Sequence, residues 1–125
     1  MFCDLVYESI KELLAEGRVT VQSFDVRILQ YWLQKWPETS LALLVENRNT
    51  IRQNLDLLGF RPRIYSPEYV LLSEQDIAYL HHEGMKVVPW TVNEKTDMTR
   101  LISWGVDGMI TDYPDRFFDL YNIKH

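Results

Sequence analysis

A regular spacing of apolar segments constrains the fold of this chain more than any other feature. Five short runs rich in β-branched and aromatic residues are typical of strands. They begin near residues 19, 41, 63, 86 and 106, so the intervals are 22, 22, 23 and 20 residues. The expected strands cover residues 19–25, 41–46, 63–69, 86–93 and 106–113. Each interval leaves room for one helix and two short loops, so the spacing predicts a βα repeat.

The segments between these runs carry apolar residues at helical spacing. The apolar stripes comprise Leu29, Trp32, Leu33 and Trp36; Ile51, Leu55 and Leu58; Ile77 and Leu80; and Met98, Leu101 and Ile102. Another amphipathic helix is expected before the first strand and ends at Gly17. We expect Trp32 and Trp36 to be packing residues. The sequence thus predicts one helix, four βα units and a final strand.

Capping residues fit the same helices. Ser73 and Asn93 each precede acidic residues, and both are expected to be N-caps. Gly59, Gly84 and Gly105 each follow a helical stripe and precede a strand, which is where helices usually end.

The repeat predicts an α/β fold with a parallel sheet, because parallel neighbours need a crossover connection. The run from Leu41 to Val45 is apolar throughout, which is typical of a strand buried on both faces in a barrel or a doubly wound sheet. No linker or change of composition divides the chain. Residues 1–125 are therefore expected to form a single unit.

Composition excludes several classes of protein. Hydrophobic residues make up 46% of the 125 residues, which is too many for a disordered chain. The net charge of −5 argues against a nucleic-acid surface. A lone cysteine, Cys3, cannot form an intrachain disulfide. No apolar run approaches the roughly 20 residues of a membrane span, and the first residues do not show the basic segment followed by an apolar one that is typical of a signal peptide.

Polar residues follow the expected strands at their carboxyl ends, where α/β folds place functional groups. Four carboxylates, Asp25, Glu46, Glu68 and Asp112, lie at such positions. Together they could bind Mg²⁺ or Ca²⁺, which prefer oxygen ligands. The alternative interpretation, that they cap helices or lie in solvated loops, is favoured.

Other candidate groups are weak. His81 and His82 are neighbours about 100° apart on a helix, so they cannot bind a metal as an i, i+4 pair does, and we expect them to be exposed. His125 is the last residue. Ser23 is not framed by the glycines of a nucleophile elbow. No glycine-rich phosphate loop occurs. Trp90 lies near a strand end, where a ligand-facing role and a core role both remain open.

Four segments taken together carry a family resemblance. They are Gln22-Ser23-Phe24-Asp25, Tyr65-Ser66-Pro67, Val88-Pro89-Trp90-Thr91-Val92-Asn93, and the run from Gly105 to Pro114 (GVDGMITDYP). In this order they resemble the C-terminal half of glycerophosphodiester phosphodiesterases. The resemblance implies a TIM-type (β/α)₈ barrel, and 125 residues are half of the about 250 that such a barrel needs.

The resemblance also implies hydrolysis of glycerophosphodiesters to glycerol 3-phosphate and an alcohol. In that family a divalent cation, Ca²⁺ or Mg²⁺, is held by carboxylates, and two histidines act as acid and base. The family's His-Arg-Gly, Glu-x-Asp, His-Asp and Glu-Ile-Lys segments precede the Ser-Phe strand, and this sequence contains none of them. No catalytic residue or metal ligand therefore carries over, and the chain alone is expected to bind no cation and to be inactive.

What the resemblance does carry over is a substrate-binding rim. It implies that Phe24 and Trp90 form the apolar wall of the substrate pocket, with Ser23 and Asn93 as polar supports. Asp112 is expected to make a structural hydrogen bond. A second hypothesis is a non-catalytic half-barrel whose open sheet edges pair with another copy or with a missing N-terminal half. The sequence leaves open whether Met1 is a natural start, the preferred head group, the compartment and the oligomeric state.

Overall fold

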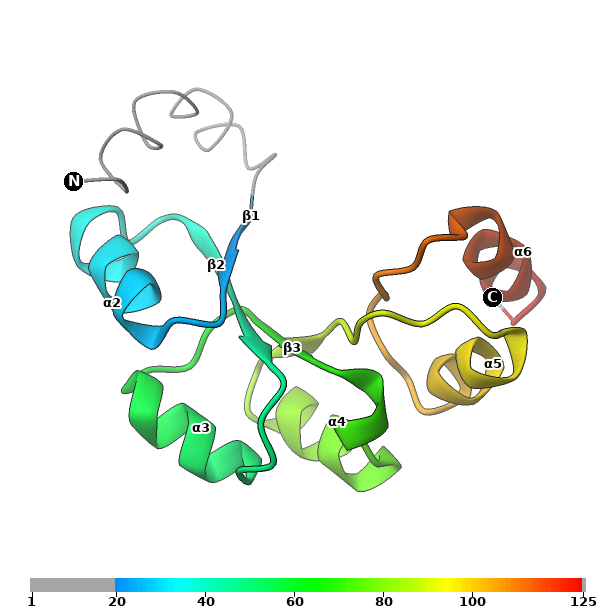
Figure 1. Cartoon of the computed structure of the whole chain (residues 1–125), viewed down its shortest axis with the longest axis horizontal. Helices are drawn as coiled ribbons and strands as arrows, with labels where there is room; N and C mark the ends of the chain where they lie inside the picture. The colour runs from blue at the N-terminus through cyan, green and yellow to red at the C-terminus, as the bar shows by residue number, and fades with distance from the viewer. Residues whose placement is uncertain (1–19, 125) are drawn as a thin grey trace.

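The computed structural model describes residues 20–124 and contains four short strands and six helices in this range (Figure 1). In chain order they are β1 (Thr20–Ser23), α2 (Val26–Lys35), β2 (Ser40–Val45), α3 (Ile51–Leu58), β3 (Ile64–Pro67), the 3₁₀ helix η1 (Tyr69–Leu71), α4 (Glu74–His82), β4 (Lys86–Val87), α5 (Lys95–Ser103) and α6 (Pro114–Lys124). The expected first helix, Gly17, Cys3 and His125 lie outside the described residues.

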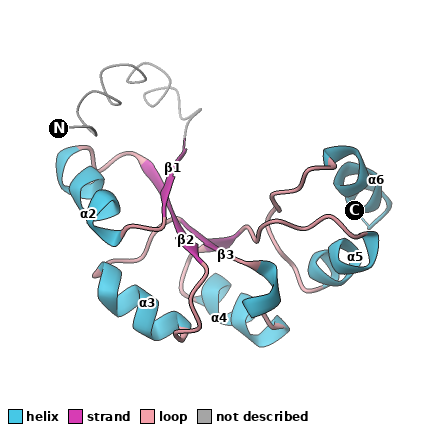
Figure 2. Cartoon of the chain, viewed as in Figure 1, coloured by secondary structure: helices cyan, strands magenta, loops and turns pink. Residues whose placement is uncertain are grey.

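The strands form one parallel sheet in the order β1-β2-β3-β4, as the βα repeat predicts. Ser23 pairs with Leu43, which pairs with Tyr65, which pairs with Val87. Figure 2 shows the helices arranged in an arc around the strands. Each crossover from one strand to the next contains a helix, so the predicted α/β class is confirmed.

Residues 106–113 do not form the predicted fifth strand. This segment runs beside residues 87–92 and makes three backbone hydrogen bonds with them, each 2.9 Å long: Asp107 N to Val87 O, Ile110 N to Pro89 O, and Val92 N to Ile110 O. It forms no continuous ladder. Pro89 has no N–H to donate, which also explains why β4 ends at Val87 instead of Asn93.

Alternation along the strands separates two faces of the sheet. Leu41, Leu43 and Val45 are buried in the core with Tyr65 and Val87, against apolar residues of the helices. Tyr65 identifies this face as the outer, helix-covered one, because its hydroxyl accepts a hydrogen bond from Asn54 of α3 at 3.0 Å. The alternate residues, among them Ala42, Leu44, Ile64 and Ser66, lie on the concave face.

Most of the expected helix caps are present in the structure, and one is not. Ser73 caps α4 in a reciprocal capping box with Asp76. Gly59, Gly84 and Gly105 have φ angles of 85°, 85° and 94°, so they end helices as expected. Asn93 is not an N-cap. Its side chain is bonded to Thr111 and Asp112 instead. The N-cap of α5 is Glu94, which makes no side-chain capping bond.

Two tryptophans of α2 and its C-cap were expected to be packing residues. Trp32 is buried and Trp36 packs against the core, which confirms the packing role of both residues.

Helix α6 is not predicted from the sequence, although Pro114 occupies its first position, where proline is favoured. None of the described helices is long and apolar enough to cross a membrane.

Candidate functional site

The centre of the candidate site is a contact between two aromatic rings on the concave face. Phe24 directly follows β1 and Trp90 follows β4, so they come from the first and the last strand of the sheet. Their ring centroids are 5.7 Å apart and the ring planes meet at 88°, an edge-to-face arrangement. The two rings therefore meet across β2 and β3. Phe24 remains 50% exposed, so the pair is open to a ligand.

Hydrogen bonds fix the orientation of Trp90. Its indole Nε1 donates to the Ser66 carbonyl oxygen at 2.7 Å, and the Ser66 hydroxyl donates to the Val88 carbonyl oxygen. The Trp90 backbone bonds to Pro67 O and accepts from Tyr69 N. Trp90 is half-buried, so it both packs against Ser66 and presents ring surface on the concave face. The structure thus shows the packing role of Trp90, and a ligand-facing role stays a prediction.

Ser23 shapes the turn that carries Phe24. Its Oγ accepts a hydrogen bond from the backbone N–H of Asp25 at 2.9 Å. Asp25 in turn caps α2 by accepting from Arg27 N, and the Arg27 guanidinium bonds to both oxygens of its carboxylate. These hydrogen bonds from Arg27 lower the pKa of Asp25. Ser23 therefore shapes the turn that contains Phe24, and a role in substrate binding stays a prediction.

Asn93 ties the segment after α5 to the loop that precedes α5. Its Oδ1 accepts hydrogen bonds from Thr111 Oγ1 (3.1 Å) and Asp112 N (3.0 Å), and its Nδ2 donates to Asp112 Oδ2 (3.0 Å). Arg116 donates to the Asn93 carbonyl oxygen and lies over the ring of Tyr113. Asp112 therefore makes the structural hydrogen bond expected of it, with Asn93 as its partner.

The four carboxylates at the carboxyl edge do not gather into a metal site. Within residues 20–124, no group of three or more His, Cys, Asp or Glu side chains could hold a metal ion. Asp25 is a helix cap and Asp112 is bonded to Asn93. Glu46 is exposed in a loop, and Glu68 precedes η1 without a side-chain capping bond. These positions agree with the favoured interpretation as caps and loop residues.

His81 and His82 are exposed, as expected. His81 Nε2 lies 2.7 Å from Asp107 Oδ2, and the same oxygen accepts a hydrogen bond from Val87 N at 2.7 Å. Val87 is the last residue of β4, three residues before Trp90, and His81 lies in the last turn of α4. The Asp107 carboxylate therefore cross-links α4, β4 and the segment that follows α5.

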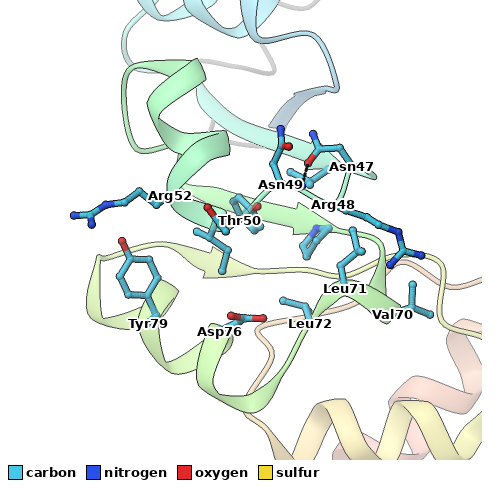
Figure 3. A pocket seen from close by; sticks show the side chains of 14 residues that line it. Asn47, Arg48, Asn49, Thr50, Arg52, Val70, Leu71, Leu72, Asp76 and Tyr79 are labelled. Carbon is cyan, nitrogen blue, oxygen red and sulfur yellow. Dashed lines mark hydrogen bonds between the residues drawn. The ribbon is translucent and has the colours of Figure 1, made fainter.

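A second feature, which the sequence reasoning missed, is a pocket of about 530 Å³ on the helix-covered side of the carboxyl edge (Figure 3). The loops after β2 and β3 form it. Arg48 and Arg52 extend from it in opposite directions, so no pair of cations converges on one ligand. Asp76 accepts from Ser73 N, and burial raises the pKa of Tyr65 at its base. The polar run from Asn47 to Thr50 is the only sequence signal for this pocket.

Two comparisons with known sequences indicate the same family. A sequence model described as the Glycerophosphoryl diester phosphodiesterase family matches residues 3–116. A glycerophosphodiester phosphodiesterase of Caldanaerobacter subterraneus subsp. tengcongensis is 33% identical over 115 residues, which cover 90% of this chain and 46% of that protein.

Solved structures show the same fold. The crystal structure of a glycerophosphodiester phosphodiesterase from Parabacteroides distasonis superposes with a TM-score of 0.81 at 22% identity and covers 98% of this chain and 50% of the other. An Oleispira antarctica phosphodiesterase, solved with its product sn-glycerol-3-phosphate, gives a TM-score of 0.71 at 20% identity, covering 82% and 41%. The expected partial TIM-type barrel is thereby confirmed. The chain spans about half the length of these proteins.

Proposed function

This chain belongs to the glycerophosphoryl diester phosphodiesterase family, and from that membership we propose that it is part of a metal-dependent enzyme that hydrolyses glycerophosphodiesters to glycerol 3-phosphate and an alcohol. The observation that carries the proposal is the family match over residues 3–116, in a chain that places Phe24 against Trp90 on the concave face. The product bound to the Oleispira antarctica phosphodiesterase supports glycerol 3-phosphate as the product here.

In the proposed enzyme, Phe24 and Trp90 form the apolar wall beside the substrate. Apolar ring surface excludes water, which strengthens the electrostatic interactions made by neighbouring polar groups. Ser23 and Asn93 act as supports: Ser23 shapes the turn of Phe24, and Asn93 holds the Thr111–Asp112 segment next to the loop that follows Trp90.

The chain alone is proposed to be inactive. The described carboxylates do not form a Ca²⁺ or Mg²⁺ site, so they do not fit the cation that the family resemblance implies. His81 lies on α4, where it is bonded to Asp107, and we assign it no acid or base role beside Trp90. We place the cation ligands and the catalytic histidines in the part of the barrel that this chain does not supply.

A release assay tests both parts of this proposal. The purified chain, mixed with glycerophosphocholine or glycerophosphoethanolamine and Ca²⁺ or Mg²⁺, is expected to release no glycerol 3-phosphate. A chimera that carries this chain in place of the matched segment of the Caldanaerobacter relative is expected to release it. In the chimera, W90A should reduce turnover, whereas V70A, an exposed apolar position on η1, should not. EDTA-sensitive turnover by the chain alone would overturn the proposed inactivity. A folded but inactive chimera would overturn the proposed function.

One observation favours a second candidate, a non-catalytic half-barrel that dimerises or docks. Within the described sheet, β1 pairs with β2 on one side only, and such an edge can pair with another chain. This function predicts a concentration-dependent dimer, or a stable complex with a separate N-terminal half. A folded chain that stays monomeric in multi-angle light scattering up to tens of micromolar, and that binds no such half, would exclude it.

A further inference from the structure

The exposed surface of the Phe24–Trp90 pair limits the kind of group that it can recognise. The only hydrogen-bond donor of the indole, Nε1, is occupied by the Ser66 carbonyl oxygen at 2.7 Å. Phe24 has no polar group. The pair therefore offers only aromatic ring surface to a ligand, and the electron-rich faces of such rings attract cations.

Two carboxylates follow the same strands at the same edge of the sheet. Glu68 is paired directly with Trp90 in a parallel bridge. Glu46 comes one residue after Val45, which pairs with Pro67, so the register places Glu46 next to Glu68. Within the described part of the chain, neither glutamate side chain has a hydrogen bond or an ion pair. Both are therefore available to a cationic ligand.

Within residues 20–124, no ion pair involves Glu46 or Glu68. Arg27 is bound to Asp25, and Arg116 lies over the Tyr113 ring and donates to Asn93 O. Arg48 lines the pocket on the helix-covered side. Lys86 is four residues before Trp90, which is roughly 13 Å along an extended strand.

Building on the proposed function, we propose that Trp90, Phe24 and Glu68 recognise a cationic alkylammonium group on the alcohol of the substrate. The rings supply cation–π attraction, and the glutamate supplies a counter-charge. Quaternary ammonium groups are recognised in this manner by aromatic side chains. The site selects glycerophosphodiesters with an ammonium-bearing alcohol over those with a neutral polyol, for which the rings offer no hydrogen bond.

Choline binding to the isolated full chain tests this proposal without any catalysis. Choline chloride is titrated into the isotope-labelled chain, and the four tryptophan indole N–H resonances are followed by NMR. Loss of one signal in W90F assigns Trp90. We expect a saturable shift of the Trp90 resonance at tens of millimolar choline, roughly the affinity that exposed cation–π contacts and one carboxylate supply, while Trp32, Trp36 and Trp104 serve as internal references. Sodium chloride at equal concentration controls for ionic strength.

Two comparisons separate charge recognition from simple apolar contact. The neutral isostere of choline, in which carbon replaces the quaternary nitrogen, should bind at least about fivefold more weakly, because an exposed cation–π contact and a carboxylate favour the charged form. E68Q should weaken choline binding about threefold, whereas E74Q, a matched change in the first turn of α4, should not. Ethanolamine, tested in parallel, determines whether the ammonium must be quaternary.

Each outcome decides the proposal. Selective, Glu68-dependent choline binding supports it. No Trp90 shift up to about 0.5 M choline, a concentration above the dissociation constant of roughly 10–100 mM that contacts of this strength imply, would overturn it. Equal binding of the neutral isostere would also overturn it. The proposed hydrolase function has a separate readout, because a chimera that releases glycerol 3-phosphate from a neutral diester retains that function even when choline does not bind.

Discussion

The ring of Phe24 lies edge-on against the indole of Trp90, with 5.7 Å between their centroids, although the two residues follow opposite edge strands of the sheet. This contact requires a sheet that curves strongly from β1 to β4. It joins the two ends of the sheet by side chains alone, with no backbone pairing between β1 and β4.

The ring contact should contribute measurably to stability. We expect F24L to lower the free energy of unfolding by about 1 kcal/mol, because an aromatic pair adds roughly 0.5–1.5 kcal/mol beyond the apolar area that it buries. The F24L/W90L cycle, in which each change removes one ring, should give a coupling energy that favours the pair, measured by urea unfolding. V70A is the matched change at an exposed apolar position and should have little effect. Strictly additive effects of F24L and W90L would contradict the prediction.

Loss of the Asn93 side chain should loosen the segment that it holds. N93A removes the bonds to Thr111, Asp112 N and Asp112 Oδ2, so we expect a loss of about 1–3 kcal/mol. Hydrogen exchange should become faster at the Asp112 amide before it does so in the core strands. N47A is the control, since Asn47 Oδ1 accepts only a local bond from Asn49 N. Unchanged exchange at Asp112 in N93A would refute this role.

The capping box of α3 should stabilise that helix. Thr50 Oγ1 accepts from Gln53 N, and the Gln53 side chain accepts from Thr50 N. T50A should therefore lower the free energy of unfolding by about 1 kcal/mol. T96A changes an exposed threonine inside α5 and should shift stability by less than about 0.5 kcal/mol. Equal effects of the two changes in chemical denaturation would rule out a capping role.

Alkaline pH should destabilise the fold partly through Tyr65. Burial raises the pKa of this phenol in the folded state above that of the unfolded chain. The unfolded chain therefore loses the proton first, so the contribution to stability is complete below about pH 10 and is lost as the pH rises through the folded-state pKa.

The variant Y65F tests this expectation. It leaves Asn54 without its partner and should be less stable than the wild type at neutral pH by about 1–3 kcal/mol. Its unfolding free energy should fall less steeply between pH 9 and 11, in roughly the range where tyrosine ionises. Parallel curves for Y65F and the wild type would show that the Tyr65 hydroxyl makes no contribution to the alkaline loss.

Features set by local chemistry could be predicted from the sequence. The starts of β1, β2 and β3, the Ser73 cap and the glycines that end helices depend on neighbouring residues only, and each agrees with the structure within about a residue. Asn93 shows where this reasoning fails. A side chain that could cap the next helix locally instead bonds to residues 18 and 19 positions away, and a single sequence does not show that competition.

The candidate site was predictable in part. The family resemblance implied Phe24 and Trp90 as one wall, and the structure brings their rings into contact. The anchoring of Trp90 by Ser66 and the pocket between the loops after β2 and β3 could not be anticipated, because both depend on sheet curvature and loop geometry. Whether Phe24, Trp90, Ser23 and Asn93 contact a substrate remains a prediction.

One carboxylate oxygen of Asp107 contacts both His81 and Val87, and this bears on which substitutions the chain can accept. This oxygen joins His81 of α4 to Val87 of β4, whereas the ring of Trp90 lies three residues farther along the chain. The contacts of Asp107 and the proposed ligand site therefore use different residues. Under the proposed function, substitutions in the loops that carry Phe24 and Glu68 can change ligand preference without removing the contacts of Asp107.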